Sequence, residues 1–240
     1  MKVLVIGRYQ DVRKEDVEGK NVAVIDVFRT TSVIVTALEN GASCIIPAET
    51  INKARTIGVK MDDSEILYAG ERNALPIEGF HLDNSPFSYM KESIKNKTII
   101  MTTSNGTKAI RSGRPALHLY IASFLNTSAV VDVLEEQGND VTIICAGTLG
   151  MFSLEDGICA GFIASSLAGK IESVEITDLA WAMKHLVESG IDVKKALEQG
   201  SYAYSRLLET GYEKDVEYCI SPDTSRTVPI LTSDGWIEVL

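Results

Sequence analysis

The chain has 240 residues, of which 45% are hydrophobic, so it can fill a substantial core and a globular fold is expected. Its formal net charge of −10 disfavours nucleic acids and anionic membranes as partners, because both attract clustered Lys and Arg. No stretch reaches the roughly 18 consecutive apolar residues that cross a bilayer, and the apolar run at residues 1–6 is too short for a signal peptide. The four widely spaced cysteines contain no C-x-x-C pair, which is typical of reduced thiols in a cytoplasmic protein.

Short apolar runs rich in β-branched residues alternate with helical patterns along the chain. The runs that predict buried strands are 22–26, 43–47, 98–102, 117–121 and 141–145. The segments that predict helices are 30–40, 107–112, 124–138 and 155–169. Right-handed crossovers place such helices on both faces of a mainly parallel sheet. We therefore expect an α/β fold with a three-layer α/β/α architecture.

The last third of the chain has a different pattern. From about 174 to 220 there are few strand signals, and the spacing of Asp and Gly predicts three or four consecutive helices that form a helical C-terminal subdomain. Residues 221–226 predict a turn-rich loop, and 228–232 with 236–240 predict a closing hairpin. Because no linker interrupts the chain, we expect one α/β domain over residues 1–240.

Polar residues follow several predicted strands, and in an open parallel sheet ligands bind beyond the carboxyl ends of the strands. Asp26 ends one strand and Arg29 follows it, which offers a metal-binding carboxylate and a phosphate-binding guanidinium to one crevice. Alternatively, Asp26 and Arg29 pair with each other while Thr30 or Thr31 caps the helix. A charge at the end of an apolar strand is costly without a dedicated partner, which favours the functional interpretation.

A second polar segment lies between the strand at 98–102 and the next helix. Gly106 permits a tight turn, and the hydroxyl groups with the free amides of the helix start favour an anion-binding loop. Thr103, Ser104, Asn105 and Thr107 supply those polar groups. An ordinary capped turn explains this segment equally well.

The third polar segment follows the strand at 141–145. Gly147 permits close backbone approach, and Glu155 and Asp156 open the next helix, where negative side chains also offset the helix dipole. If Asp156 instead points into the crevice beside Asp26, the two carboxylates can share a hard cation.

The fourth polar segment, 70–86, is rich in Gly, Pro and charged residues and predicts a long loop. Loops of this length in compact domains are often functional. Glu71 and Arg72 repeat the combination of one acid and one base at the end of the short run 66–69, and Asn84 lies further along the segment.

Together these segments resemble the 2-phosphosulfolactate phosphatase family. The segments that carry the resemblance are DVFRTT (26–31), GER (70–72), NSP (84–86), TSNGT (103–107), CAG (145–147), ED (155–156) and SPD (221–223). The resemblance covers nearly the whole chain and implies Mg²⁺-dependent hydrolysis of 2-phospho-3-sulfolactate to 3-sulfolactate and phosphate. That reaction is a step of coenzyme M synthesis in methanogens, but the resemblance implies the activity and not the pathway. Family analogy and the apolar tail 236–240 also suggest a homo-oligomer.

Such a substrate carries phosphate, carboxylate and sulfonate groups, so an acidic protein must concentrate positive charge in its cleft. Arg29, Arg72 and Arg226 are the candidates, because a guanidinium fork matches these oxyanions. The remaining residues predicted to bind substrate come from the polar loops and are Asn84, Thr103, Ser104, Asn105, Gly106, Thr107 and Gly147.

Mg²⁺ is the predicted cofactor. We expect Asp26, Glu71 and Asp156 to hold it and to act in catalysis, since hard cations prefer oxygen ligands. The ion would neutralise phosphoryl oxygens and orient or acidify the attacking water.

Three alternatives remain open. An aspartyl-phosphate route through Asp26, as in haloacid-dehalogenase-type phosphatases, needs a second Asp two residues later, where the chain has Phe28, so attack by water is favoured. An isochorismatase-like cysteine amidohydrolase would use Asp26, Lys108 and Cys145. A non-catalytic anion-binding protein would use the same loops and arginines, although the neighbouring acids disfavour it.

Overall fold

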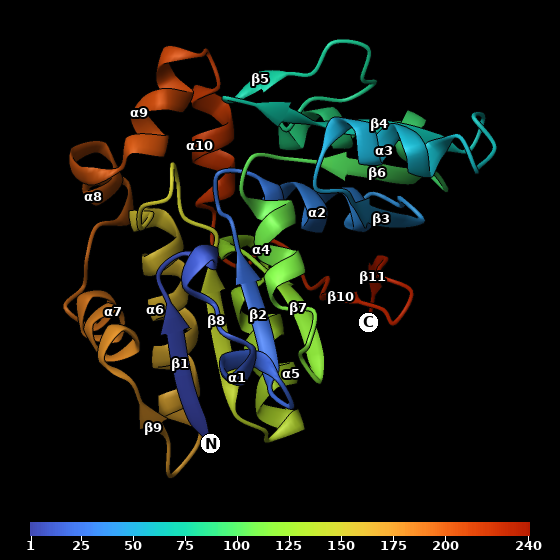
Figure 1. The fold of residues 1–240 in the computed structure, drawn as a ribbon. Helices are drawn as coiled ribbons and strands as arrows, with labels where there is room; N and C mark the ends of the chain where they lie inside the picture. Colours follow the sequence, from blue (N-terminus) through green and yellow to red (C-terminus); the bar gives the residue numbers. More distant parts are fainter.

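We describe the protein from a computed structural model that covers all 240 residues. The strands are β1 (Lys2–Ile6), β2 (Asn21–Ile25), β3 (Cys44–Pro47), β4 (Ile66–Arg72), β5 (Leu75–Pro76), β6 (Thr98–Thr102), β7 (His118–Ala122), β8 (Val141–Cys145), β9 (Glu175–Ile176), β10 (Pro229–Leu231) and β11 (Ile237–Val239). They form one 11-stranded sheet in the order β5-β4-β6-β3-β11-β10-β7-β2-β8-β1-β9 (Figure 1).

The sheet consists of two parallel groups of strands joined by a hairpin. Strands β4, β6 and β3 run parallel to one another, as do β7, β2, β8, β1 and β9. The antiparallel hairpin of β10 and β11 lies between the groups and pairs Ile230 with Tyr120 on one side and Ile237 with Ile45 on the other. The sheet is therefore mainly parallel, as predicted, and the predicted closing hairpin is its centre.

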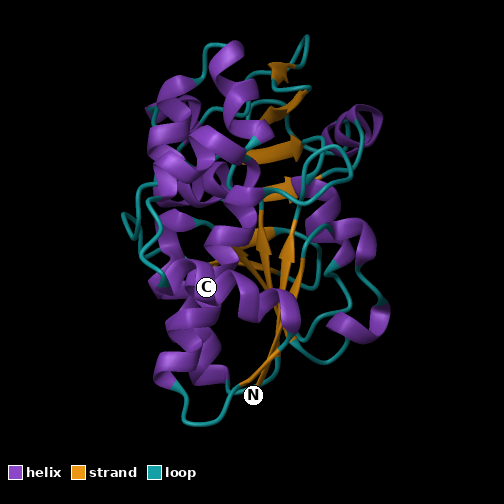
Figure 2. Cartoon of the chain, turned by 90° about the vertical axis from the view of Figure 1, so that its left-hand side faces the viewer, coloured by secondary structure: helices purple, strands orange, loops and turns teal.

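Helices cover both faces of this sheet (Figure 2), which confirms the three-layer α/β architecture. The helices are α1 (Lys14–Val17), α2 (Thr30–Glu39), α3 (Ile51–Gly58), α4 (Gly106–Ser112), α5 (Thr127–Gln137), α6 (Leu154–Lys170), α7 (Asp178–Glu188), α8 (Val193–Gly200), α9 (Tyr202–Glu209) and α10 (Glu213–Cys219). Short 3₁₀ helices are η1 (Tyr9–Asp11), η2 (Pro86–Tyr89), η3 (Glu92–Ile94) and η4 (Phe124–Asn126).

Successive residues of β2 pack into different cores because side chains alternate across a strand. Ala23 and Ile25 belong to the cluster that contains residues of α5 and α6, whereas Val22 and Val24 belong to the cluster with residues of α2 and α4. All four side chains are fully buried, as expected for a strand covered on both faces.

The predicted helical segment near 174–220 contains α7, α8, α9 and α10 in succession, preceded by the two-residue strand β9 beside β1. Helix α7 packs along α6, and α9 and α10 lie near the ends of the strands, at the top of Figure 1. This arrangement brings α9 to the carboxyl ends of the strands, where the predicted site residues gather.

The predicted loop 70–86 differs from the structure at its start. Strand β4 continues through Gly70 to Arg72, and a two-residue turn leads into β5. Gly70 pairs with Thr102 of β6 with a φ of 142°, and a Cβ at Gly70 would lie 1.9 Å from the Thr102 carbonyl oxygen. Gly70 is therefore a strand residue at a close backbone contact, which sequence patterns do not distinguish from a loop glycine.

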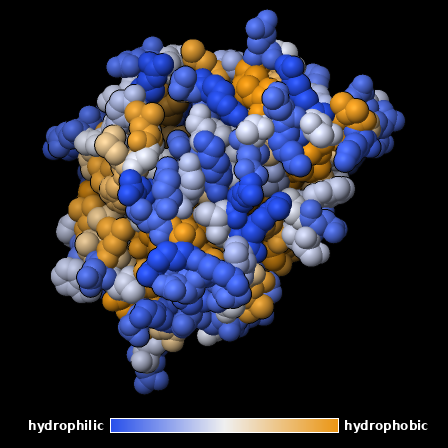
Figure 3. Space-filling model, in the orientation of Figure 1, coloured by the Kyte–Doolittle hydropathy of each residue, from blue (hydrophilic) through white to orange (hydrophobic).

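The cysteines and the surface of the protein do not by themselves point to a particular function. All four cysteines are free and buried. No helix has both the length and the apolar character to cross a membrane. Figure 3 shows a mostly hydrophilic face with hydrophobic surface along the side where α6 and α7 lie. The exposed apolar residues of the chain include Leu149, Met151, Phe152 and Trp181.

Candidate active site

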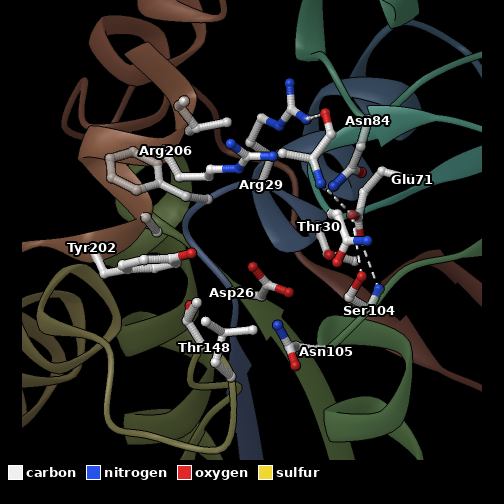
Figure 4. A pocket seen from close by; sticks show the side chains of 16 residues that line it. Asp26, Arg29, Thr30, Glu71, Asn84, Ser104, Asn105, Thr148, Tyr202 and Arg206 are labelled. Atoms are coloured by element: carbon white, nitrogen blue, oxygen red, sulfur yellow. Dashed lines mark hydrogen bonds between the residues drawn. The ribbon is translucent and has the colours of Figure 1, made fainter. Parts of the chain in front are cut away.

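A cavity of about 290 Å³ lies beyond the carboxyl ends of β2, β4, β6 and β8 (Figure 4). Its walls come from the loops that follow these strands, from the loop after β5 and from α9. The two parallel groups of strands thus contribute to one site, which is where an open parallel sheet is expected to bind ligands.

Asp26 follows β2 and lines the cavity, and the residue is only 8% exposed. The Thr31 hydroxyl accepts the amide of Asp26 and donates to its carbonyl oxygen, which fixes the backbone at the start of α2. Burial raises the pKa of Asp26 from 3.8 to about 7, assisted by the negative charges of Glu71 and Glu155, while the Thr30 hydroxyl opposes the rise. A group with this pKa can gain or lose a proton near neutral pH.

Glu71 enters the cavity from the end of β4 and is also buried. Its carboxylate accepts the backbone amide of Ser104 at 2.6 Å, the Ser104 hydroxyl at 3.2 Å and the amide of Ala74 at 2.9 Å. The side chain therefore connects the β4–β5 turn to the β6–α4 loop and keeps both beside Asp26.

The β6–α4 loop, predicted to bind anions, contributes Ser104 and Asn105 to the cavity lining. Thr103 and Thr107 lie behind it, where the Thr107 amide donates to the Thr103 hydroxyl at 3.2 Å and the Thr30 hydroxyl donates to the same group at 3.1 Å. These two threonines support the loop and do not line the cavity.

Arg29 lines the cavity but is almost completely buried. Its Nη1 donates to Asp215 of α10 at 2.6 Å, its Nη2 donates to the Ala74 carbonyl at 3.1 Å, and its guanidinium lies 4.0 Å from the ring centre of Tyr212. Asp215 is also buried and accepts the Ser85 hydroxyl. The pairing of Arg29 is thus with Asp215, not with Asp26 as the alternative interpretation proposed.

Asp156 lies close to the site without lining it. Its carboxylate oxygens accept the amides of Val27 at 2.9 Å and Gly147 at 3.1 Å, so it joins the ends of β2 and β8. Burial raises its pKa well above the ordinary value, with further contributions from the charges of Glu155 and Asp26. Gly147 has the same connecting role through its backbone.

Two other predicted arginines, Arg72 and Arg226, have protein partners and do not line the cavity. Arg72 donates to the carbonyl oxygens of Glu71 and Thr102 and to the Thr102 hydroxyl. Arg226 has a side chain that is 76% exposed and pairs with Asp132. The structure does not bring these two cations to the lining, and their predicted contacts with substrate stay predictions.

Helix α9 contributes lining residues that the sequence did not predict, among them Tyr202 and Arg206. They lie on the opposite side of the cavity from Glu71 and Ser104 in Figure 4. No signal near residues 202–206 points to a site, because only the packing of the helical segment brings α9 to the strand ends.

Two residues of the predicted cysteine amidohydrolase set lie away from the cavity. Cys145 is fully buried, and burial raises its thiol pKa well above the ordinary value. Lys108 is exposed on α4 and does not line the cavity. A thiolate nucleophile is disfavoured in this environment.

The oxygen groups in the cavity suit a hard cation. Asp26 and Glu71 both line it, and so does Asn84, whose buried Oδ1 has no hydrogen-bond partner. Carboxylate and amide oxygens are suitable ligands for Mg²⁺, which usually retains several waters. No group of three or more His, Cys, Asp or Glu side chains is arranged to hold a metal ion, so Asp26, Glu71 and Asp156 do not form one ligand set in this geometry.

Comparison with known proteins assigns the family. The family model described as 2-phosphosulpholactate phosphatase matches residues 7–234. The chain belongs to this family. A relative from Clostridium acetobutylicum, named a probable 2-phosphosulfolactate phosphatase, is 39% identical over 97% of this chain and 98% of its own. A relative with the same name from Clostridium botulinum is 38% identical over the full length of both chains. Another with this name, from Thermotoga petrophila, is 42% identical over 92% of this chain and 93% of its own.

Proposed function

We propose that the chain is a Mg²⁺-dependent phosphatase that hydrolyses 2-phospho-3-sulfolactate, or a closely similar phosphorylated hydroxy acid, to the hydroxy acid and phosphate. The observation that carries this proposal is the placement of Asp26, Glu71 and the unpartnered Asn84 oxygen in one cavity at the strand ends of a family member. A small and multiply anionic ester fits a cavity of this size and polarity.

Asp26, Glu71 and Asn84 would hold Mg²⁺ in this proposal. The bound ion would supply charge neutralisation for the phosphoryl oxygens. Asp156, the third ligand predicted from the sequence, does not line the cavity, and its carboxylate accepts the amides of Val27 and Gly147. Its role would be to hold the backbone of Asp26 in place.

The other side chains of the cavity would position substrate and water. Ser104 and Asn105 would orient the phosphate beside the carboxylates. Phe28, where an aspartyl-phosphate mechanism needs an acid, favours water as the nucleophile. A cytoplasmic location and a homo-oligomeric state belong to the same proposal.

Phosphate release from 2-phospho-3-sulfolactate tests the function. EDTA should abolish release and added Mg²⁺ should restore it. Asp26→Asn and Glu71→Gln should each lower kcat/KM by roughly 100-fold or more, since a metal contributes several kcal/mol of charge stabilisation. Glu136→Gln, at an exposed position of α5, should keep the wild-type rate.

Release that persists in EDTA and survives both cavity substitutions would contradict the proposal. Inhibition by a thiol-blocking reagent with no response to EDTA would instead favour the amidohydrolase alternative. Trapping of an acylphosphate on Asp26 would replace attack by water with the aspartyl-phosphate route.

A further inference from the structure

Arg29 and Arg206 both line the cavity, but only one of them has a buried counter-charge within the protein. Arg29 is buried against Asp215, with further contacts to the Ala74 carbonyl and the Tyr212 ring. Its positive charge is compensated within the protein, so it has little capacity to bind a second anion.

Arg206 differs from Arg29 in its partners. Its guanidinium contacts Glu209 at 3.4 Å, a long distance for a charged hydrogen bond, and both side chains are partly exposed. Figure 4 shows Arg206 reaching from α9 towards the middle of the cavity. Most of its guanidinium donors are therefore available to a ligand.

The position of α9, and so of Arg206, is fixed by buried contacts. The Ser201 hydroxyl caps the helix by accepting the amide of Tyr204 at 3.0 Å and donates to Glu155 of α6 at 2.7 Å. Tyr204 and Leu207 pack into the main hydrophobic cluster. Arg206 thus lies on a helix that is anchored to α6 through Glu155.

We propose that Arg206 binds one of the two anionic groups that the substrate carries besides the phosphate, and thereby selects esters with an additional oxyanion. This inference rests on the proposed function, which puts the phosphate beside Asp26 and Glu71. The second group, a carboxylate or a sulfonate, would then point to the α9 side, where a guanidinium matches either oxyanion with paired donors.

Substrate selectivity tests the proposal. The substrates are 2-phospho-3-sulfolactate, 2-phospholactate, which lacks the sulfonate, and propyl phosphate, which lacks both additional anions. Arg206→Gln should lower the kcat/KM ratio of 2-phospho-3-sulfolactate to propyl phosphate by roughly 10- to 100-fold, the usual range for a charged hydrogen bond. Arg206→Lys should restore part of the ratio, and Arg55→Gln, on an exposed part of α3, should not change it.

The rate with 2-phospholactate shows which anionic group Arg206 binds. If Arg206 binds the sulfonate, the substitution should remove the preference for 2-phospho-3-sulfolactate over 2-phospholactate. If Arg206 binds the carboxylate, the kcat/KM values of 2-phospho-3-sulfolactate and of 2-phospholactate should fall by the same factor relative to that of propyl phosphate. An equal loss for all three substrates would overturn the proposal.

A binding measurement separates this inference from the phosphatase function. Calorimetry with 3-sulfolactate in Mg²⁺ buffer needs no turnover, and Arg206→Gln should weaken binding by roughly tenfold or more. If no ester is hydrolysed but 3-sulfolactate binding depends on Arg206, the phosphatase function fails, and of this inference only the anion-binding role of Arg206 stands. If esters are hydrolysed but 3-sulfolactate binds wild type and Arg206→Gln equally, the inference fails and the phosphatase function stands.

Discussion

The absence of a side chain at residue 106 allows α4 to start against the carboxyl group of Asp26. A Cβ at Gly106 would lie 2.4 Å from Asp26 Oδ2, 2.4 Å from Thr30 Cβ and 2.5 Å from Thr30 Oγ1. Such distances are far below van der Waals contact, so any side chain here must displace Asp26 or the start of α2. The glycine is required by the space around it and not by its backbone angles.

Gly106→Ala should therefore lower both activity and stability. We expect a destabilisation of about 1–3 kcal/mol, the usual range for an overpacked site, and a loss of kcat. Gly169→Ala is the matched control, because Gly169 lies in α6 with open space around its α carbon. There alanine should stabilise the helix by up to about 1 kcal/mol. Thermal unfolding and phosphate release measure both effects, and equal behaviour of the two variants would refute the steric argument.

At the scale of elements, the Arg29–Asp215 ion pair joins α10 to the loop between β2 and α2. Both side chains are almost fully buried, and Ser85 adds a third segment to the contact. Tyr212, just before α10, stacks on Arg29 and donates to Asp83 at 3.2 Å. This cluster keeps the helical segment against the strand ends and so shapes the cavity.

Asp215→Asn should be strongly destabilising, because it leaves the charge of Arg29 buried without a counter-charge. A broken buried pair typically costs about 3–5 kcal/mol. Replacing both residues, as Arg29→Met with Asp215→Leu, should recover much of the stability while activity stays low. Urea unfolding of the single and double variants measures this coupling, and additive losses would show that the pair is not a unit.

The elements themselves were largely predictable from the sequence, since strands such as 98–102 and 141–145 have strong apolar patterns that local rules describe. Asp26 and Glu71 were found because polar residues after apolar strands stand out, and Asn84 was found in the polar segment 70–86 that carries part of the family resemblance. Arg206 was missed, and the partner of Arg29 was not foreseen, because both depend on how α9 and α10 pack over residues that are distant in sequence.

For the whole molecule, three buried acids near one another link stability to pH. Burial raises the pKa values of Asp26, Glu155 and Asp156, and the charges of neighbouring acids add to the rise for Asp26 and Asp156. A raised pKa means that the native state holds a proton that the unfolded chain has released. The stability contributed by that proton is complete below the ordinary pKa and is lost as pH rises through the folded value.

The free energy of unfolding should therefore decrease between about pH 4 and pH 7 in the range set by Asp26. Asp26→Asn should flatten this decrease, and Mg²⁺ should also reduce it, because the ion stabilises the ionised carboxylates. Glu136→Gln should keep the wild-type slope. Urea unfolding at several pH values, with and without Mg²⁺, measures the slope, and an Asp26→Asn slope as steep as that of wild type would contradict the assignment.

The place of the β10–β11 hairpin has a consequence for biosynthesis. Its two strands come last in chain order, yet they bridge the two parallel groups at the middle of the sheet. During translation, the edge of β3 that pairs with β11 and the edge of β7 that pairs with β10 have no partner until the hairpin has left the ribosome. The two strand groups whose loops form the cavity are thus joined only after all the other strands have been synthesised.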